Sequence, residues 1–177
     1  WVLAKRPKGL ATINDFRLEE VPIPTLNEGQ ALVKTLYLGV APVMLRYMTN
    51  ETEFEKPLAL GDVMHGRGVG RVIASKCAAF KEGDIVQSKL GWREYAVIED
   101  NPYYLTHKMT QTDLRLSYGV GILGMNGFTA VLGMRDICTV QPGDHVLVSA
   151  AAGSVGSMVG YIAKAMGAAT VVGIAGG

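Results

Sequence analysis

Short apolar runs separated by turn residues dominate the first hundred residues of this chain. Residues 31–38 and 69–73 are short runs typical of strands, and glycine-containing turns at 28–29, 82–84 and 90–91 separate such runs. Prolines fall at the edges of the runs or between them, as Pro7, Pro22, Pro24, Pro42 and Pro57. This spacing predicts a mostly β half over 16–98, folded as a small, partly open barrel.

Helical spacing appears beyond residue 110. Thr112 or Asp113 can cap a helix that runs through Tyr118, and a second helix is predicted over 127–137. The apolar run at 145–149 then has the composition of a strand that is buried on both faces.

A helix is predicted from Ser157 to Met166, where Gly167 suits a left-handed C-terminal cap. Residues 169–175 form a second apolar run that reads as a buried strand. Strand, helix and strand within roughly 30 residues are the size of a parallel crossover. The sequence therefore predicts two domains, of which the second is incomplete.

The turn between the first of these strands and the helix carries a phosphate-binding pattern. Residues 151–156 read AAGSVG, which matches G-x-G-x-x-G except that alanine replaces the first glycine. Gly153 would let the backbone approach a pyrophosphate and Gly156 would let the helix pack against the strand, while the N–H groups of 154–156 face the anion. The predicted cofactor-binding residues here are Ala152, Gly153, Ser154, Val155 and Gly156. The alternative is that small residues merely permit tight packing.

The end of the second predicted strand bears on which cofactor is bound. An acidic residue that binds the adenine ribose would fall about 20 residues beyond the turn. The sequence there is Ala175, Gly176 and Gly177, with no carboxylate. This favours NADPH over NADH.

Composition limits the other partners. The formal net charge is +1 and hydrophobic residues make up 49%, so neither nucleic acid nor a membrane surface is an expected partner. No apolar run is long enough to span a membrane, and no leader opens the chain. Two cysteines, Cys77 and Cys138, argue against a disulfide scaffold. We expect a soluble cytoplasmic protein that acts on a small molecule.

Several segments together resemble the zinc-independent medium-chain dehydrogenase/reductases, in the branch of prostaglandin, alkenal double-bond and curcumin reductases. They are 1–4 (WVLA) with 16–18 (FRL), 61–64 (GDVM), 91–95 (GWREY), 124–130 (GMNGFTA) and the turn with its helix at 150–160. The resemblance implies a GroES-like catalytic domain over 1–116. It implies that 117–177 hold the linking helix and the start of an NADP-binding Rossmann domain.

The same resemblance implies transfer of hydride from NADPH to the β-carbon of an α,β-unsaturated aldehyde or ketone. It places Met125, Asn126 and Thr129 on the nicotinamide side of the cofactor, although Asn126 could instead cap the helix. Tyr47 and Phe54 are weaker candidates for the substrate cleft. Phe54 stands where relatives have a tyrosine and cannot donate a hydrogen bond, so a distinct substrate is expected.

A catalytic zinc is the main rival interpretation. His65 is followed by Gly66 and Arg67, where related alcohol dehydrogenases have glutamate, and no cysteine occurs in 37–42. We therefore expect no metal site.

Two further functions stay open. A quinone reductase would share the cofactor and the fold, and the 177-residue chain could instead be a non-catalytic interaction module. A homodimer is possible in the full-length protein.

Overall fold

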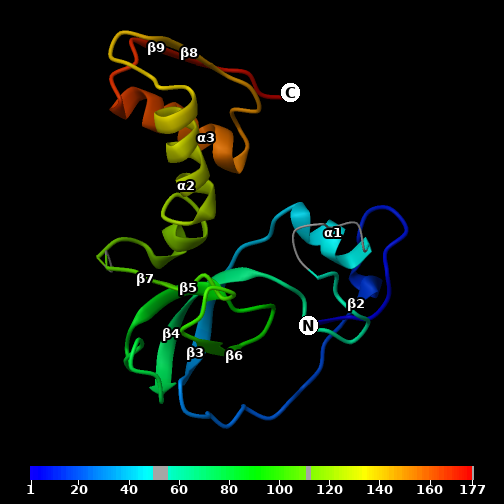
Figure 1. The fold of residues 1–177 in the computed structure, drawn as a ribbon. Helices are drawn as coiled ribbons and strands as arrows, with labels where there is room; N and C mark the ends of the chain where they lie inside the picture. The colour runs from blue at the N-terminus through cyan, green and yellow to red at the C-terminus, as the bar shows by residue number, and fades with distance from the viewer. Residues whose placement is uncertain (50–55, 111–112, 177) are drawn as a thin grey trace. The chain divides into compact units, whose positions relative to one another are not determined.

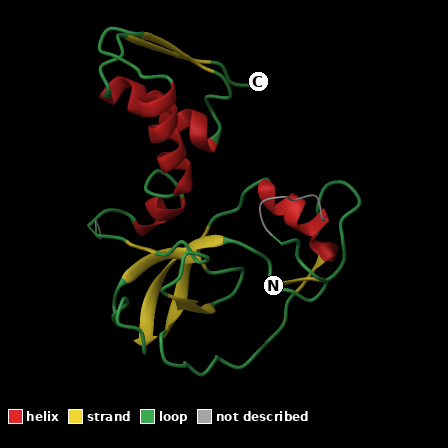
Figure 2. Ribbon diagram, viewed as in Figure 1, coloured by secondary structure: helices red, strands yellow, loops and turns green. Residues whose placement is uncertain are grey.

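A computed structural model describes residues 1–49, 56–110 and 113–176. The chain divides into two compact units, Trp1–Leu116 and Ser117–Gly177, and each unit is described by itself. Figure 1 follows both along the chain and Figure 2 colours them by secondary structure.

Antiparallel strands build the first unit. β1 (Val2–Leu3) pairs with β2 (Phe16–Arg17), which follows the 3₁₀ helix η1 (Ile13–Asp15). The larger sheet has five strands in the order β6 (Tyr95–Glu99), β3 (Gln30–Leu38), β4 (Arg67–Ser75), β5 (Ile85–Lys89) and β7 (His107–Lys108). The strands predicted at 31–38 and 69–73 are confirmed as β3 and β4.

The larger sheet is strongly curled (Figure 1), and it encloses an apolar core. Its inward side chains come from four strands and from two positions outside them, Phe80 before β5 and Leu90 just after it: Ala31, Val33, Val72, Phe80, Val86, Leu90, Ala96 and Ile98. Gly70 allows the paired strands β3 and β4 to lie close together where the sheet bends, because a Cβ atom there would lie 2.7 Å from the carbonyl oxygen of Lys34. Register shifts in β3 at Leu32/Val33 and Thr35/Tyr37 add to this bend.

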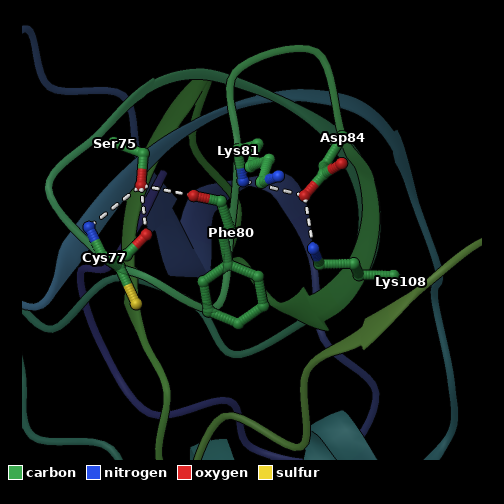
Figure 3. A network of polar contacts seen from close by, with 6 residues as sticks. All are labelled: Ser75, Cys77, Phe80, Lys81, Asp84 and Lys108. Carbon is green, nitrogen blue, oxygen red and sulfur yellow. Dashed lines mark hydrogen bonds and ion pairs between the residues drawn. The ribbon is translucent and has the colours of Figure 1, made fainter.

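A polar network fixes the turn between β4 and β5 (Figure 3). The Ser75 hydroxyl accepts a bond from the Cys77 N–H (3.0 Å) and donates to the carbonyl of Phe80 (2.6 Å). The Asp84 carboxylate accepts from the Lys81 N–H (2.8 Å) and pairs with the Lys108 ammonium (2.8 Å). The turn is thereby tied to β7 as well as to its own strands.

A helix lies in the half of the chain that was predicted to be mostly β. α1 covers Val43–Thr49 and buries Met44 and Met48. Its inner face belongs to a second core cluster formed by Leu3, Met48, Leu58 and Met64, against which Phe16, Tyr47 and Trp92 pack.

The second unit contains the predicted crossover. Its elements are η2 (Leu116–Val120), which begins on the last residue of the first unit, α2 (Met125–Leu132), the π-helix η3 (Gly133–Ile137), β8 (His145–Val148), α3 (Ser154–Ala165) and β9 (Thr170–Gly173). β8 and β9 pair in parallel, and Gly167 after α3 has φ +93°, as its predicted capping role requires. α3 begins three residues earlier than predicted. Among the described helices, none combines the length and the hydropathy needed to cross a membrane.

The prediction that these strands are buried on both faces is wrong for this chain. Val148 is 6% exposed and Val171 packs toward α3, whereas Leu147 is 67% and Val172 51% exposed. Leu147 and Val172 are direct partners across the ladder. Helix α3 covers one face of the two-stranded sheet, so the apolar side chains on the opposite face remain at the surface.

Candidate functional site

The turn from β8 into α3 is shaped by an alanine in the left-handed region. Ala150 has φ +49°, and its carbonyl oxygen accepts a hydrogen bond from the Gly153 N–H at 2.9 Å. Gly153 is the N-cap of α3, with extended backbone angles (φ −74°, ψ 167°), and its own carbonyl accepts from the Ser157 N–H. The chain therefore turns within four residues, and α3 begins next to the end of β8.

The two fingerprint glycines lie where side chains do not fit. A Cβ atom at Gly156 would come within 2.9 Å of the Ala150 carbonyl carbon and 3.0 Å of the Ala151 Cα. A Cβ at Gly153 would lie 3.1 Å from the Ala150 oxygen. Gly156 thus lets the first turn of α3 pack onto the backbone of the preceding turn, while Gly153 is under milder constraint.

The first turn of α3 presents backbone N–H groups. Helix geometry leaves the N–H groups of Ser154, Val155 and Gly156 without partners inside the helix. Within the described residues, no side chain caps this end of the helix. Ser154 is exposed, and Val155 and Gly156 are half-buried. The helix dipole places partial positive charge here, and an anion such as a phosphate is the ligand that such a turn binds.

A pocket of about 360 Å³ lies beside the turn and continues along α3 and β9. Its lining combines backbone of the turn with helix side chains: Val148, Ala151, Gly156, Ser157, Gly160, Tyr161, Lys164, Val171 and Gly173. The cation Lys164 is ten residues beyond Ser154, or about 15 Å along the helix axis, so it does not neutralise an anion at the turn. The residues after β9, Ala175 and Gly176, supply no carboxylate there.

The start of α2 holds the second group of predicted site residues. Gly124 is the N-cap of α2, so the alternative interpretation of Asn126 as the N-cap is wrong. Asn126 is half-buried in the first turn and Met125 is 47% exposed. The Thr129 hydroxyl donates to the Met125 carbonyl at 2.8 Å, so one helical turn joins these two residues.

Tyr47 and Phe54 were the candidates for the substrate side of the first unit. Tyr47 lies in α1, half-buried against the second core cluster, with its ring 5.3 Å from the His65 ring in an edge-on contact. Phe54 lies outside the described residues. The aromatic contact with His65 had no signal in the sequence, because the two residues belong to separate segments.

The described part of the chain contains no group of three or more histidine, cysteine or acidic side chains that could hold a metal ion. His65 contacts the Tyr47 ring, and Cys77 lies in the polar turn between β4 and β5.

Comparison with known proteins places these features in context. Residues 1–104 match the family described as the N-terminal domain of oxidoreductase. The chain is 40% identical over 177 residues to the NADPH-dependent curcumin reductase of Escherichia coli (strain K12), covering 100% of this chain and 50% of that protein. It is 37% identical over 179 residues to the NADP(+)-dependent 2-alkenal reductase of Nicotiana tabacum, covering 99% and 51%.

A solved structure agrees with the fold. The crystal structure of CurA in complex with NADPH from Vibrio vulnificus superposes with a TM-score of 0.85 at 38% identity, covering 99% of this chain and 51% of that one. The predicted combination of a partly open barrel with the opening of a Rossmann domain is thereby confirmed. The chain spans about half the length of the relatives it matches.

Proposed function

Because this chain belongs to the zinc-independent medium-chain dehydrogenase/reductases, we propose that its protein is an NADPH-dependent reductase of carbon-carbon double bonds conjugated to a carbonyl group. The first unit contributes to the substrate side, and the second unit contributes the phosphate-binding half of the cofactor site.

The observation that carries the proposal is the turn at the start of α3. Gly156 excludes a side chain, the Gly153 N–H is bonded to Ala150, and the N–H groups of the first helical turn are left for an anion. In this role the backbone of Ser154, Val155 and Gly156 holds the cofactor pyrophosphate, and the exposed Ala152 and Gly153 border it.

NADPH is favoured over NADH on two grounds. No carboxylate follows β9 at Ala175 or Gly176, where one would repel a 2′-phosphate. Two of the relatives carry NADPH or NADP(+) in their names, and the CurA structure contains NADPH.

The remaining residues are assigned to the reacting end of the cofactor. Met125, Asn126 and Thr129 on the first turns of α2 border the nicotinamide, and Tyr47 with Phe54 borders the substrate. When bound, NADPH supplies a hydride to the β-carbon of the unsaturated carbonyl compound, and a proton then reaches the α-carbon. Phe54 brings no hydroxyl group, so the carbonyl oxygen must take its hydrogen bond from another donor.

The test uses the full-length protein with two acceptors, a 2-alkenal and a benzoquinone, each with NADPH and with NADH. We expect NADPH consumption with the alkenal, formation of the saturated aldehyde, and a clear preference for NADPH. The saturated aldehyde and the unsaturated alcohol are isomers of equal mass, so the product is identified by proton NMR, which distinguishes reduction of the double bond from reduction of the carbonyl. Turnover of the quinone alone would replace the proposal with a quinone reductase.

A further inference from the structure

A surface arginine joins two segments of the first unit that are distant from it in sequence. Arg6 donates from Nη1 to the carbonyl of Met48 at 2.7 Å and from Nη2 to the carbonyl of Leu58 at 2.9 Å. A guanidinium group is planar and carries several N–H donors, so one arginine side chain can bond both carbonyls at once. Both acceptors belong to residues whose side chains are 2% exposed.

The same two segments are also bonded directly to each other. The Leu58 N–H donates to the Tyr47 carbonyl at 3.1 Å. The last turn of α1 therefore has the carbonyls of Tyr47 and Met48 satisfied, one by Leu58 and one by Arg6. Carbonyls at a helix C-terminus lack partners within the helix, and a cation there also meets the negative end of the helix dipole.

This clamp acts on the turn that carries Tyr47. The carbonyls of Tyr47 and Met48 are both hydrogen-bonded, and these bonds tie the backbone of Tyr47 to the segment around Leu58. The Tyr47 ring keeps its half-buried place between the second core cluster and the edge of His65. The neighbouring Lys5 is directed to Asp15 instead, with its ammonium 3.7 Å from the carboxylate, so the two adjacent cations have separate structural tasks.

We propose that Arg6 is a positioning residue for the substrate side of the site, and that it sets the affinity for the acceptor without contributing to cofactor binding. The inference rests on the proposed function, in which Tyr47 borders the acceptor. Within the described residues, the hydrogen bonds of Arg6 go to the backbone carbonyls of Met48 and Leu58, so its effect passes through the placement of α1.

The experiment compares Arg6→Lys and Arg6→Ala with the wild-type full-length protein. Arg17→Lys is the matched control, because Arg17 is an exposed arginine whose Nε bonds the nearby Glu19 carboxylate at 2.9 Å. Hydrogen exchange of the Leu58 amide reports the clamp without any need for activity. The KM for the acceptor, the dissociation constant for NADPH and kcat report its role.

In Arg6→Ala we expect faster hydrogen exchange at the Leu58 amide. We also expect the KM for the acceptor to rise about 10-fold, the size of effect that the loss of one hydrogen-bonded contact produces. Arg6→Lys, which can reach one carbonyl at a time, should fall between Arg6→Ala and the wild type. NADPH affinity and kcat should stay within about 2-fold, and Arg17→Lys should match the wild type throughout.

Unchanged exchange at Leu58 in Arg6→Ala would overturn the clamp. Faster exchange with an unchanged KM, or equal losses in acceptor and NADPH affinity, would overturn the positioning role. The acceptor is whichever of the alkenal and the quinone the wild type reduces, so failure of alkenal turnover alone removes the proposed reaction and leaves the inference testable. A wild-type protein that reduces neither acceptor would overturn both.

Discussion

The carbonyl carbon of Ala150 lies 2.9 Å from the position that a Cβ atom at Gly156 would occupy. The other partner in this crowding is backbone, so it cannot move aside as the end of a flexible side chain would. Gly156→Ala should therefore displace the first turn of α3 and weaken NADPH binding by the full-length protein about 10-fold or more. Titration of cofactor fluorescence measures this.

Gly160 in the same helix provides the control for that substitution. A Cβ atom there would meet only Val171 Cγ1 at 3.9 Å, an ordinary contact. Gly160→Ala should leave NADPH affinity unchanged and raise stability by about 0.5–1 kcal/mol, as expected for alanine in a helix. If both variants bound NADPH like the wild type, the turn would not be the cofactor site.

A second pair of glycines tests the packing of α2. A Cβ atom at Gly127 would lie 2.6 Å from the carbonyl carbon of Ile122, whereas Gly133 has no atom within 4 Å of that position and has helical angles (φ −58°, ψ −47°). Gly127→Ala should destabilise the protein by about 1–3 kcal/mol through overpacking, and Gly133→Ala should stabilise it by up to about 1 kcal/mol. Denaturant unfolding of both variants decides the matter, and similar values for the two would contradict the crowding.

The ion pair between Asp84 and Lys108 predicts a pH dependence of stability. The Lys108 ammonium and then the Lys81 N–H lower the pKa of Asp84 below its ordinary value of 3.8. Because the pKa is depressed in the folded state, the ionised carboxylate stabilises the fold above pH 3.8, and this contribution is lost as the pH falls through the lower folded pKa.

Asp84→Asn should therefore lower the midpoint of thermal unfolding at pH 7. The difference from the wild type should shrink as the pH falls below about 4, because the Asp84 carboxylate then becomes protonated and is neutral, as the asparagine amide is at every pH. Asp100→Asn, at an exposed carboxylate, is the control. A difference that stays constant from pH 7 to pH 3 would show that the charge of Asp84 plays no part.

The exposed apolar pair Leu147 and Val172 gives a fourth prediction. These side chains face each other across β8 and β9 on the side away from α3. The 177-residue chain should bind a hydrophobic dye and associate with increasing concentration, and Leu147→Thr with Val172→Thr should reduce both. The same replacements at the exposed Leu18 and Val21 serve as the comparison. Equal effects at the two places would show that the sheet face has no special role.

The features of the fold that were predicted correctly from the sequence are those that depend on residues close together in the chain. Gly156 and Gly167 are required by the backbone geometry of their own turns, so the residue type itself carries the information. The strand, helix and strand of the crossover follow from side-chain periodicity over about 30 residues. The same locality explains why the family resemblance rested on short motifs.

The features that sequence reasoning missed depend on distant partners. The acceptors of Arg6 are backbone carbonyls 42 and 52 residues away, and a carbonyl leaves no trace in the sequence. α1 has seven residues, too few for Met44 and Met48 to establish a helical period against the surrounding strands. An apolar run such as that of β8 records which side chains are apolar but not what covers each face, and this is why burial of Leu147 was predicted wrongly.

The pairing of β3 with β6 has a consequence for synthesis of the chain. Gln30 pairs with Glu99, and their side chains also bond at 2.8 Å although they are 69 positions apart in the sequence. A ribosome adds about 5–20 residues per second, so β3 waits roughly 3–14 s for this neighbour after it has emerged. During that interval one edge of β3 presents unpaired N–H and C=O groups beside apolar side chains. We therefore expect nascent chains that end between β4 and β6 to offer this open edge to chaperones.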